Sequence, residues 1–539
     1  MKICTARPSL PVPPIGITSP TDTSDPRDVL LVFIRTALTN KLQGNGLAFN
    51  KICESLSGKL DSGAIVRWYS TLNNCVSLIV PGPAHAQLVQ TVFAFDAWDV
   101  SPESTESYAQ FIVDLVSCNG KFLPMCFGAL VEKLRCHTTS CDVSVTSPYA
   151  LPGRTPESVL AVCEGVSSLI CRILQLIPSA LTSLFPLIVQ SFPHPRMSAD
   201  EHLAFIGNIL RLSQDAPELR DRIVQLIVQK VVLLDCESNE DHSAVDDKPA
   251  GPALDRLDRI LALLLEHLQS VQNSRPDLCG SLFASLMHVF ESTVLTSCNC
   301  RHVPFLMFYM CSFRNSFAET FLSFLLERAL DLTQPQQVRV SCSRYLRGFL
   351  MTANYVRHAS RMHCFEVILK YIHSYIEVHE DDLDEMRIVN DDTIGDGNGK
   401  GLHAVFYSLC ETMLKLFCCF KPELQELLEE APDLAEFFRF SSIVESSLNP
   451  LRFCCPDTVA EFATILISMG LGDCYPVIRR NNMLASVAHP AVSTTPFTVL
   501  RLPLSRAFFS DIHHESWHSL GDTAFSDDED EIIDNIISL

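Results

Sequence analysis

The chain has 539 residues, of which 47% are hydrophobic and 19% are charged, and its 41 Lys and Arg against 63 Asp and Glu leave a formal net charge of −22. One compact core stops growing at roughly 250 to 300 residues, so this length predicts several domains or an extended repeat array. Tight binding to nucleic-acid phosphates requires cations that release counterions. The negative balance therefore argues against strong direct binding of nucleic acid and favours a protein partner.

Residues 1–27 are rich in proline, serine and threonine, a composition that predicts a disordered tail. From residue 28 to residue 235, apolar residues recur at helical spacing and predict an N-terminal half built from helical repeats. Asp215 and Glu218 have the spacing of a capping box, which predicts that one of these helices starts here.

One stretch in this half, residues 173–193, carries no charge over a length close to the roughly 20 residues that cross a bilayer. Pro178 and the following Ser179 interrupt it, because proline breaks a helix and the pair suits a turn between two packed helices. We therefore expect no membrane span and no membrane partner.

The segment 236–252 is polar and acidic and predicts a solvated loop. Residues 253–376 return to helical spacing and predict the middle helical repeats. Five apolar residues within them recur at intervals of three and four and predict one stripe that faces a neighbouring helix: Leu257, Leu261, Leu264, Leu268 and Val271.

A second polar segment, residues 377–402, is rich in Asp and Glu, contains the glycine-rich IGDGNGKG and predicts an acidic insertion. Residues 403–520 predict the C-terminal helical repeats, and residues 521–539 predict an acidic tail. In that tail Ser526 precedes four acidic residues, the pattern that kinases of the casein kinase II type prefer. The alternative is that these acidic segments only keep the chain solvated.

Strand signals are sparse, because alternating apolar runs bounded by tight turns hardly occur. Pairs of helices separated by short polar turns predict an all-α fold, a HEAT-repeat-like α-solenoid with a disordered N-terminal tail, acidic loops and an acidic C-terminal tail. The 22 cysteines fall mostly in apolar helical runs, where a thiol acts as a small hydrophobe, so we expect a reduced, intracellular chain.

The motifs for catalysis or cofactor binding are incomplete, which predicts that the protein is not an enzyme and uses no cofactor. Gly399 and Lys400 resemble the end of a phosphate-binding loop, but Gly401 stands where a Ser or Thr would hold magnesium. Three possible zinc ligands are spaced more tightly than is usual and lack a second pair downstream: Cys298, Cys300 and His302. A metal site is therefore not expected.

The stretch Val303 to Leu326, which reads VPFLMFYMCSFRNSFAETFLSFLL, resembles the signature of the RNA polymerase I-specific transcription initiation factor family, TIF-IA. Further segments are similar to this family in the same order along the chain: Tyr108–Met125, Asn208–Asp235, Arg256–Leu268, Tyr345–Val356, Leu448–Leu451 and Arg479–Asn482. Near the end Ser505 and Phe508 also match, although Thr495 and Thr498 replace the usual phenylalanine and acidic residue of the family.

The resemblance implies an all-helical HEAT-repeat protein that joins RNA polymerase I, through its stalk and neighbouring surfaces, to the promoter-bound selectivity or core factor for ribosomal RNA transcription. It implies a location in the nucleus and nucleolus and control by protein kinases. It also implies a serine-containing patch on the polymerase-binding face, and Ser117 and Ser179 fall on the matching segments. Phosphates there would block docking through repulsion and the cost of removing water.

Three alternatives stay open at this point. Ser117 and Ser179 also suit plain capping of helix ends. Another HEAT-repeat adaptor, of the transport or phosphatase-scaffold type, would share the fold without binding RNA polymerase I. A homodimer of the free protein is compatible with every feature above.

Overall fold

The computed structural model describes residues 26–96, 98, 101–136, 155–240, 251–297, 300–387, 403–430, 438–484 and 502–510. These residues form helices and no β-strand, which confirms the predicted all-α fold. The predicted N-terminal tail up to residue 25 and the predicted acidic tail 521–539 lie outside the described residues.

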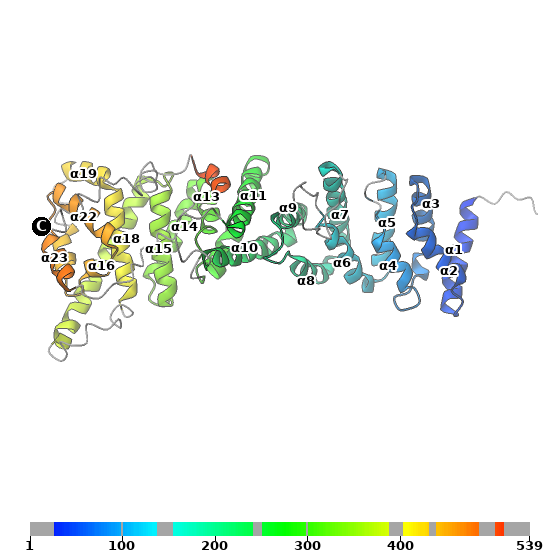
Figure 1. Ribbon diagram of the computed structural model, residues 1–539, viewed down its shortest axis with the longest axis horizontal. Coiled ribbons are helices and arrows are strands. Elements are labelled where there is room, and N and C mark those ends of the chain that lie inside the picture. Colours follow the sequence, from blue (N-terminus) through cyan, green and yellow to red (C-terminus); the bar gives the residue numbers. More distant parts are fainter. Residues whose placement is uncertain are drawn as a thin grey trace, which may run out of the picture. The chain divides into compact units, whose positions relative to one another are not determined.

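The chain divides into two compact units, Met1–Ser191 and Phe192–Leu539, called unit 1 and unit 2 below. In unit 1 the described α-helices are α1 (Pro26–Leu42), α2 (Leu47–Ser57), α3 (Ser62–Asn73), α4 (Ala86–Ala94), α5 (Pro102–Cys118), α6 (Leu123–Lys133), α7 (Pro156–Leu176) and α8 (Leu181–Ser191). Helices α1, α3, α5 and α7 pack in sequence as one layer, and α2, α4, α6 and α8 pack in sequence as the other (Figure 1).

Hydrogen bonds at both ends of α3 and α5 show that these two helices run parallel. At the start of both helices the Ser62 hydroxyl lies 2.6 Å from that of Ser101 and 2.8 Å from that of Ser104. At their far ends the Asn73 side chain donates to the Asp114 carboxylate at 2.8 Å. Parallel stacking of alternate helices is the arrangement of a helical-repeat solenoid, as the sequence predicts.

An aromatic cluster fills the interior between α3, α5 and α7. Tyr69 is fully buried, and its ring meets Tyr108 edge to face with ring centres 5.1 Å apart. Trp98, just before α5, packs edge-on against Tyr108 at 5.6 Å and covers Gly165 of α7. A Cβ at position 165 would lie 2.7 Å from the Trp98 ring, so glycine is what allows this close approach.

The uncharged stretch 173–193 is divided as predicted, because α7 ends at Leu176 and the short η3 helix (Pro178–Ala180) makes the turn into α8. Among the described helices, α7 by itself is long and apolar enough to cross a membrane, and half of its most apolar window is buried. Helix α5 and the segment Gly120–Lys133 pass the same test only as a pair bent by 115°. Such burial fits a core helix, and the absence of a membrane span stays a prediction.

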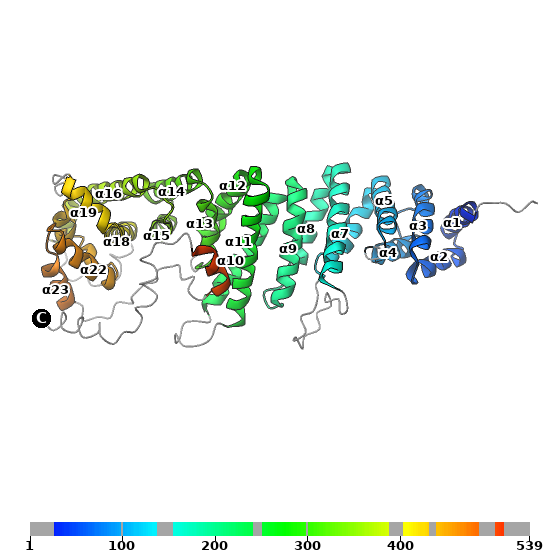
Figure 2. The same ribbon diagram turned by 90° about the horizontal axis from the view of Figure 1, so that it is seen from above.

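In unit 2 the described α-helices are α9 (Ala199–Asp215), α10 (Pro217–Glu240), α11 (Pro252–Ser274), α12 (Cys279–Val289), α13 (Pro304–Ser312), α14 (Asn315–Leu330), α15 (Gln336–Thr352), α16 (His358–Arg387), α18 (Ala404–Cys419), α19 (Lys421–Glu430), α21 (Phe440–Glu445), α22 (Pro456–Ser468), α23 (Tyr475–Leu484) and α24 (Pro503–Arg506). Helices α15, α18 and α22 pack in sequence as one layer, and α14 and α16 lie side by side on the opposite face (Figure 2). Unit 2 therefore also has the two-layer build of helical repeats.

Helices α10 and α16 run past the boundaries predicted for the loop 236–252 and the insertion 377–402, whose first residues are therefore helical. Most of both segments lies outside the described residues, and the other predicted boundaries stay predictions. Asp215 is the last residue of α9, and the Ala216 N–H still donates to the Leu212 carbonyl at 3.0 Å. Helix α10 starts at Pro217, which confirms the predicted helix start. Only the predicted cap at Asp215 is wrong, because Asp215 still belongs to α9.

A buried carboxylate organises the start of α13. Asp235 of α10 is fully buried, and its Oδ2 accepts the backbone N–H groups of Arg301, His302 and Val303 at 2.9, 2.7 and 3.1 Å. Its Oδ1 accepts the His302 Nδ1–H at 2.8 Å, and the Cys300 thiol donates to Oδ2 at 3.2 Å. Burial alone would raise the pKa of Asp235, but the hydrogen bonds from His302 and Val303 outweigh it and hold that pKa below its usual range. The ionised carboxylate thus caps the N-terminus of α13.

A second buried carboxylate, Asp258 of α11, holds the segment around α24. The backbone N–H groups of Leu504 and Ser505 donate to it at 2.9 and 2.8 Å, and the Ser505 hydroxyl donates at 2.6 Å. Phe509 packs edge-on against Phe305 of α13, with ring centres 5.2 Å apart. The C-terminal segment, red in Figure 2, therefore returns to α11 and α13.

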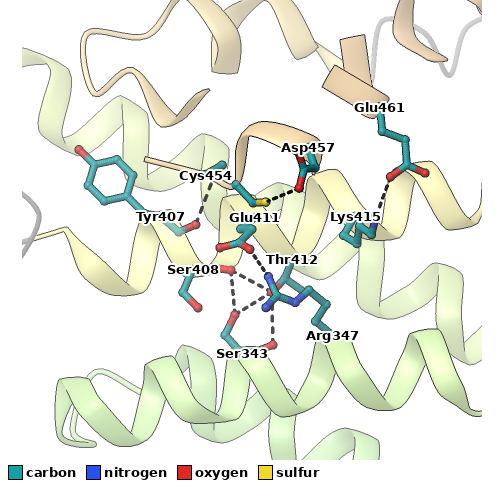
Figure 3. A network of polar contacts seen from close by, with 11 residues as sticks. Ser343, Arg347, Tyr407, Ser408, Glu411, Thr412, Lys415, Cys454, Asp457 and Glu461 are labelled. Atoms are coloured by element: carbon teal, nitrogen blue, oxygen red, sulfur yellow. Dashed lines mark hydrogen bonds and ion pairs between the residues drawn. The ribbon is translucent and has the colours of Figure 1, made fainter. Parts of the chain in front are cut away.

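Polar contacts tie α15 to α18 inside unit 2 (Figure 3). Arg347 of α15, with 9% of its side chain exposed, forms an ion pair with Glu411 of α18 at 2.6 Å. The hydroxyls of Ser343 and Thr412 lie 3.0 Å apart across the same two helices. Because buried polar groups are costly without their partners, these contacts fix how α15 and α18 align.

Two motif segments of the sequence, LNPL and RRNN, meet near the end of unit 2. Asn449 and Asn481 exchange side-chain amide hydrogen bonds of 2.6 and 3.0 Å. Asn449 has a φ of 44°, in the left-handed region that Asn tolerates better than most residues. The pair fixes α23 on the η6 helix (Pro450–Arg452), so both motifs have a structural role.

Replacing Asp235 by Asn is expected to destabilise unit 2, because an amide keeps the shape but loses the charge that the N–H donors require. The expected loss in the free energy of unfolding is about 2–3 kcal/mol. Thermal unfolding of the full chain, followed by circular dichroism, measures it. The control Asp255→Asn changes an exposed carboxylate of α11 and should leave the midpoint nearly unchanged. Equal midpoints for the two variants would contradict the capping role of Asp235.

Candidate interaction surface

The turns that lead from one layer of unit 1 to the other lie at a common edge. They join α1 to α2, α3 to α4, α5 to α6 and α7 to α8, and stacked parallel helices bring such turns to the same side. We call this surface the turn edge, and it consists of residues 41–47, 73–86, 117–125 and 175–182.

The turn edge exposes a row of large apolar side chains. Leu47 is 76% exposed and Leu176 is 62% exposed. The other exposed apolar residues of the row are Leu42, Val80 and Met125. Single exposed apolar residues are ordinary, but a row along one edge is typical of a protein-binding surface.

The charge of the turn edge differs from that of the whole chain. Its four turns contain no Asp or Glu, and their charged residues are Lys41 and Lys121. The turns at the opposite edge of unit 1 carry carboxylates such as Asp61 and Asp96. In a chain with a formal net charge of −22, an edge free of carboxylates suits a partner surface that is apolar or negatively charged.

A buried histidine holds the turn between α3 and α4 in place. The His85 Nδ1 accepts the Val80 N–H at 3.0 Å, so its Nε2–H donates to the Leu38 carbonyl of α1 at 3.2 Å. The ring also stacks on Phe49 of α2, with ring centres 5.6 Å apart. Burial lowers the pKa of His85, because the charged imidazolium would lose water, and the nearby Lys41 ammonium lowers it further. Protonation would also turn Nδ1 into a donor that faces the Val80 N–H.

Both predicted serines lie on the turn edge. Ser117 is exposed in the last turn of α5, and Ser179 is exposed in η3, so they occupy consecutive turns. The side chain that caps the turn after α5 belongs to Asn119, whose oxygen accepts the Lys121 N–H at 3.1 Å. Within the described residues neither serine hydroxyl makes a hydrogen bond, so the capping alternative has no support. Their predicted role in docking stays a prediction.

The remaining site residues of the sequence lie elsewhere. Ser526 and Cys298 are outside the described residues. Cys300 and His302 direct their polar atoms to Asp235. In the part of the chain that the structure describes, no three His, Cys, Asp or Glu side chains are arranged to hold a metal ion.

Acidification is expected to loosen the turn that His85 holds. The unfolded chain binds this proton near the ordinary histidine pKa of about 6.5, and the folded chain binds it only at lower pH. The stabilisation of the folded turn by neutral His85 is therefore complete above about pH 7. It is lost as the pH falls below about 6.5 towards the lower pKa of the folded chain. Hydrogen exchange of residues 73–92, corrected for intrinsic rates, should show faster opening at pH 5.5 than at pH 7.5.

The variant His85→Gln should show a weaker pH dependence of this opening, because Gln does not titrate. His194→Gln, at an exposed position in unit 2, serves as the control and should keep the pH dependence of the wild type. An unchanged pH dependence in His85→Gln would show that another group controls the turn.

Comparison with known proteins agrees with the resemblance seen in the sequence. The family model described as RNA polymerase I specific transcription initiation factor RRN3 matches residues 24–252 and 237–510. The chain is 24% identical to RNA polymerase I-specific transcription initiation factor RRN3 of Mus musculus over 463 residues, which cover 78% of this chain and 68% of the relative. It is 22% identical to the factor rrn3 of Schizosaccharomyces pombe over 571 residues, which cover 94% of this chain and 89% of the relative.

A solved structure shares the fold. The crystal structure of RNA polymerase I transcription initiation factor Rrn3 superimposes with a TM-score of 0.67 at 18% identity, covering 90% of this chain and 95% of that chain. The fold is therefore that of Rrn3, and the matched segments span both units of the chain. This chain belongs to the RNA polymerase I-specific transcription initiation factor RRN3 family.

Proposed function

We propose that this protein joins RNA polymerase I to the promoter-bound selectivity or core factor and so makes the polymerase competent to start ribosomal RNA transcription. Membership in a family of RNA polymerase I-specific initiation factors, which is not a known enzyme family, supports RNA polymerase I as the partner and the nucleus as the site of action. The proposed place within the nucleus is the nucleolus, where ribosomal RNA genes are transcribed.

The turn edge of unit 1 is the proposed docking surface for the polymerase. The observation that carries this assignment is the row of exposed apolar side chains on an edge without carboxylates. Apolar residues that become buried in an interface supply most of its affinity, and the lysines at positions 41 and 121 favour a negatively charged rim on the partner. The stalk of the polymerase and its neighbouring surfaces are the proposed contact region.

Phosphorylation is the proposed control of this surface. A phosphate on Ser117 or Ser179 would add nearly two negative charges beside the apolar row. Docking would then place that charge against an apolar or acidic partner surface and remove its water, which is unfavourable on both counts. Protein kinases are therefore proposed partners, and Ser526 in the acidic tail is a further proposed target.

Joining two large partners needs more than one surface. Helical-repeat arrays present long surfaces on which several moderate patches act together. Unit 2, with its own layers of helices, is the proposed carrier of contacts to the promoter factor. A homodimer of the free protein is compatible with two separate docking surfaces. If the dimer interface covered the turn edge, the dimer would have to dissociate before RNA polymerase I could bind.

Replacing Ser117 or Ser179 by Asp is expected to weaken co-purification with RNA polymerase I, each by about tenfold, which corresponds to roughly 1.4 kcal/mol. The double variant should bind more weakly than either. Pull-down of purified polymerase by the tagged full chain, quantified over a concentration series, measures the effect. Ser57→Asp, on an exposed serine at the opposite edge of unit 1, is the matched control. If the acidic variants bind like the wild type, the serine assignment fails and the family assignment stands.

The apolar row is tested separately by the double variant Leu47→Glu with Leu176→Glu. Both side chains are exposed, so folding should survive, while binding of polymerase should fall by at least tenfold through lost apolar contact. Leu160→Glu, on an exposed leucine near the start of α7, is the control. A double variant that binds polymerase normally would move the docking surface away from the turn edge. A wild-type chain that fails to bind polymerase would favour the generic adaptor role instead.

A further inference from the structure

Three arginines lie along one edge of unit 2. Helices α11, α13 and α15 are neighbours, because α11 contacts α13 and the Phe308 ring of α13 packs against Phe349 of α15 with centres 5.1 Å apart. Arg275 follows the end of α11, Arg314 follows the end of α13, and Arg357 lies in the turn after α15. All three side chains are exposed, and we call them the arginine row.

Contacts between consecutive turns hold the arginine row together. The Arg275 guanidinium donates to a backbone carbonyl in the last turn of α9 at 3.2 Å. The Arg314 guanidinium donates to the Pro276 carbonyl, beside Arg275, at 2.7 Å. Arg357 forms an ion pair with Glu319 in the first turns of α14, close to Arg314 in sequence. These contacts bring the ends of α11, α13 and α15 to the same edge of unit 2.

Most of the charge on the arginine row has no carboxylate partner. In the described part of the chain neither Arg275 nor Arg314 forms an ion pair, and their guanidinium groups donate to carbonyls. Arg314 also lies over the Phe317 ring at 5.2 Å. Besides the three arginines, these turns carry one charged residue, the exposed Asp277. In a chain with a formal net charge of −22, such an edge fits an anionic segment.

The C-terminal segment brings the chain to this edge. The Phe508 ring packs edge-on against Tyr309 of α13, with ring centres 5.9 Å apart. Tyr309 in turn meets Phe313 at 5.1 Å, and the next residue is Arg314. Five positions separate Tyr309 from Arg314, about 8 Å along a helix. The described chain therefore ends, at Ser510, close to the arginine row.

The sequence that follows Ser510 is acidic. Residues 511–539 contain nine Asp and Glu and no Lys or Arg, and five of the nine are consecutive, from Asp527 to Glu531. We call these five residues the acidic run. Seventeen positions separate Ser510 from Asp527, and a flexible chain of that length spans roughly 20–25 Å. The acidic run is therefore within reach of the arginine row.

The acidic run also matches the row in length. Five extended residues at about 3.3 Å each cover roughly 16 Å. Packed helices lie about 8–10 Å apart, so three arginines at the ends of three neighbouring helices cover about 16–20 Å. Carboxylates along the run can thus face all three arginines at once.

We propose that the acidic run Asp527–Glu531 docks on the arginine row of its own chain. Exposed ion pairs are individually weak, but attachment of the tail at Ser510 gives the run an effective concentration in the millimolar range. A few ion pairs acting together then suffice. While it is docked, the run covers the row and keeps other anionic segments away from this edge. This contact lies on unit 2 and goes beyond the function proposed above.

Photo-crosslinking of the full chain tests this contact. p-Benzoylphenylalanine in place of Phe525 lies beside the acidic run, and mass spectrometry after irradiation identifies the residues that it reaches. At about 50 mM NaCl we expect crosslinks within one chain to residues 272–279, 312–318 and 353–361. Their yield should fall at least fivefold at about 500 mM NaCl, because salt screens exposed charges.

Charge reversal of the row gives the matched comparison. The double variant Arg275→Glu with Arg314→Glu should lower the crosslink yield at least fivefold. Arg479→Glu with Arg480→Glu makes the same change of charge at exposed positions of α23 and should change the yield less than twofold.

A change in the tail tests the same contact without altering the packed helices. Replacing each Asp and Glu of the acidic run by Asn and Gln should lower the yield as much as charge reversal of the row. Lysine at these five positions, combined with the Arg275→Glu and Arg314→Glu variant, should restore the crosslinks.

The proposal is overturned if the crosslinks fall on other parts of the chain or if neither set of charge changes lowers their yield. An equal loss in the Arg479→Glu and Arg480→Glu control would also overturn it, because the contact would then not depend on the row. Crosslinks that join two chains and disappear on dilution would place the acidic run on a second copy and would count against it as well.

Discussion

The hydrogen bonds of the buried Asp235 carboxylate hold α10 against the start of α13, and the packing in the middle of unit 2 depends on them. The carboxylate lies at zero exposure and receives hydrogen bonds from the backbone of residues 301–303, from His302 and from Cys300. A buried charge without such donors would cost several kcal/mol, so α10 and the start of α13 stabilise each other only in this arrangement. The orientation of α13 then sets the position of α14, which packs on it, and of Phe305, on which the C-terminal segment packs.

The sequence predicts what depends on local spacing and misses what depends on distant partners. The stripe from Leu257 to Val271 is buried as expected, and Pro178 makes the expected turn, because helical periodicity and proline geometry act within one element. The hydrogen bond between His302 and Asp235 joins residues 67 positions apart, and the one between Ser505 and Asp258 joins residues 247 positions apart. No local sequence pattern predicts either bond. The pattern at Asp215 located the start of α10 but not its cap, since the sequence does not show that α9 continues through Asp215.

The sequence predicts only part of the candidate surface. Ser117 and Ser179 could be placed through their motif segments, but the apolar row needs the stacking of the layers, which decides that four turns far apart in sequence share an edge. One local signal was available: these turns lack Asp and Glu in a chain that has 63 of them.

Magnitudes decide whether one phosphate can control a docking surface of this kind. Burying an exposed leucine in an interface stabilises it by about 1.5–3 kcal/mol, so the row on the turn edge can supply several kcal/mol in total. A phosphate that loses its water beside an apolar partner, with no arginine to pair with it, costs a comparable amount or more. The cost of dehydrating one or two phosphates can therefore offset the binding free energy of the whole apolar row, provided that no other charge on the turn edge holds the partner. Two lysines are too few to hold the partner, since ion pairs near the surface contribute only about 0–1 kcal/mol each. The weak charge of the edge is thus what would make it responsive to phosphorylation.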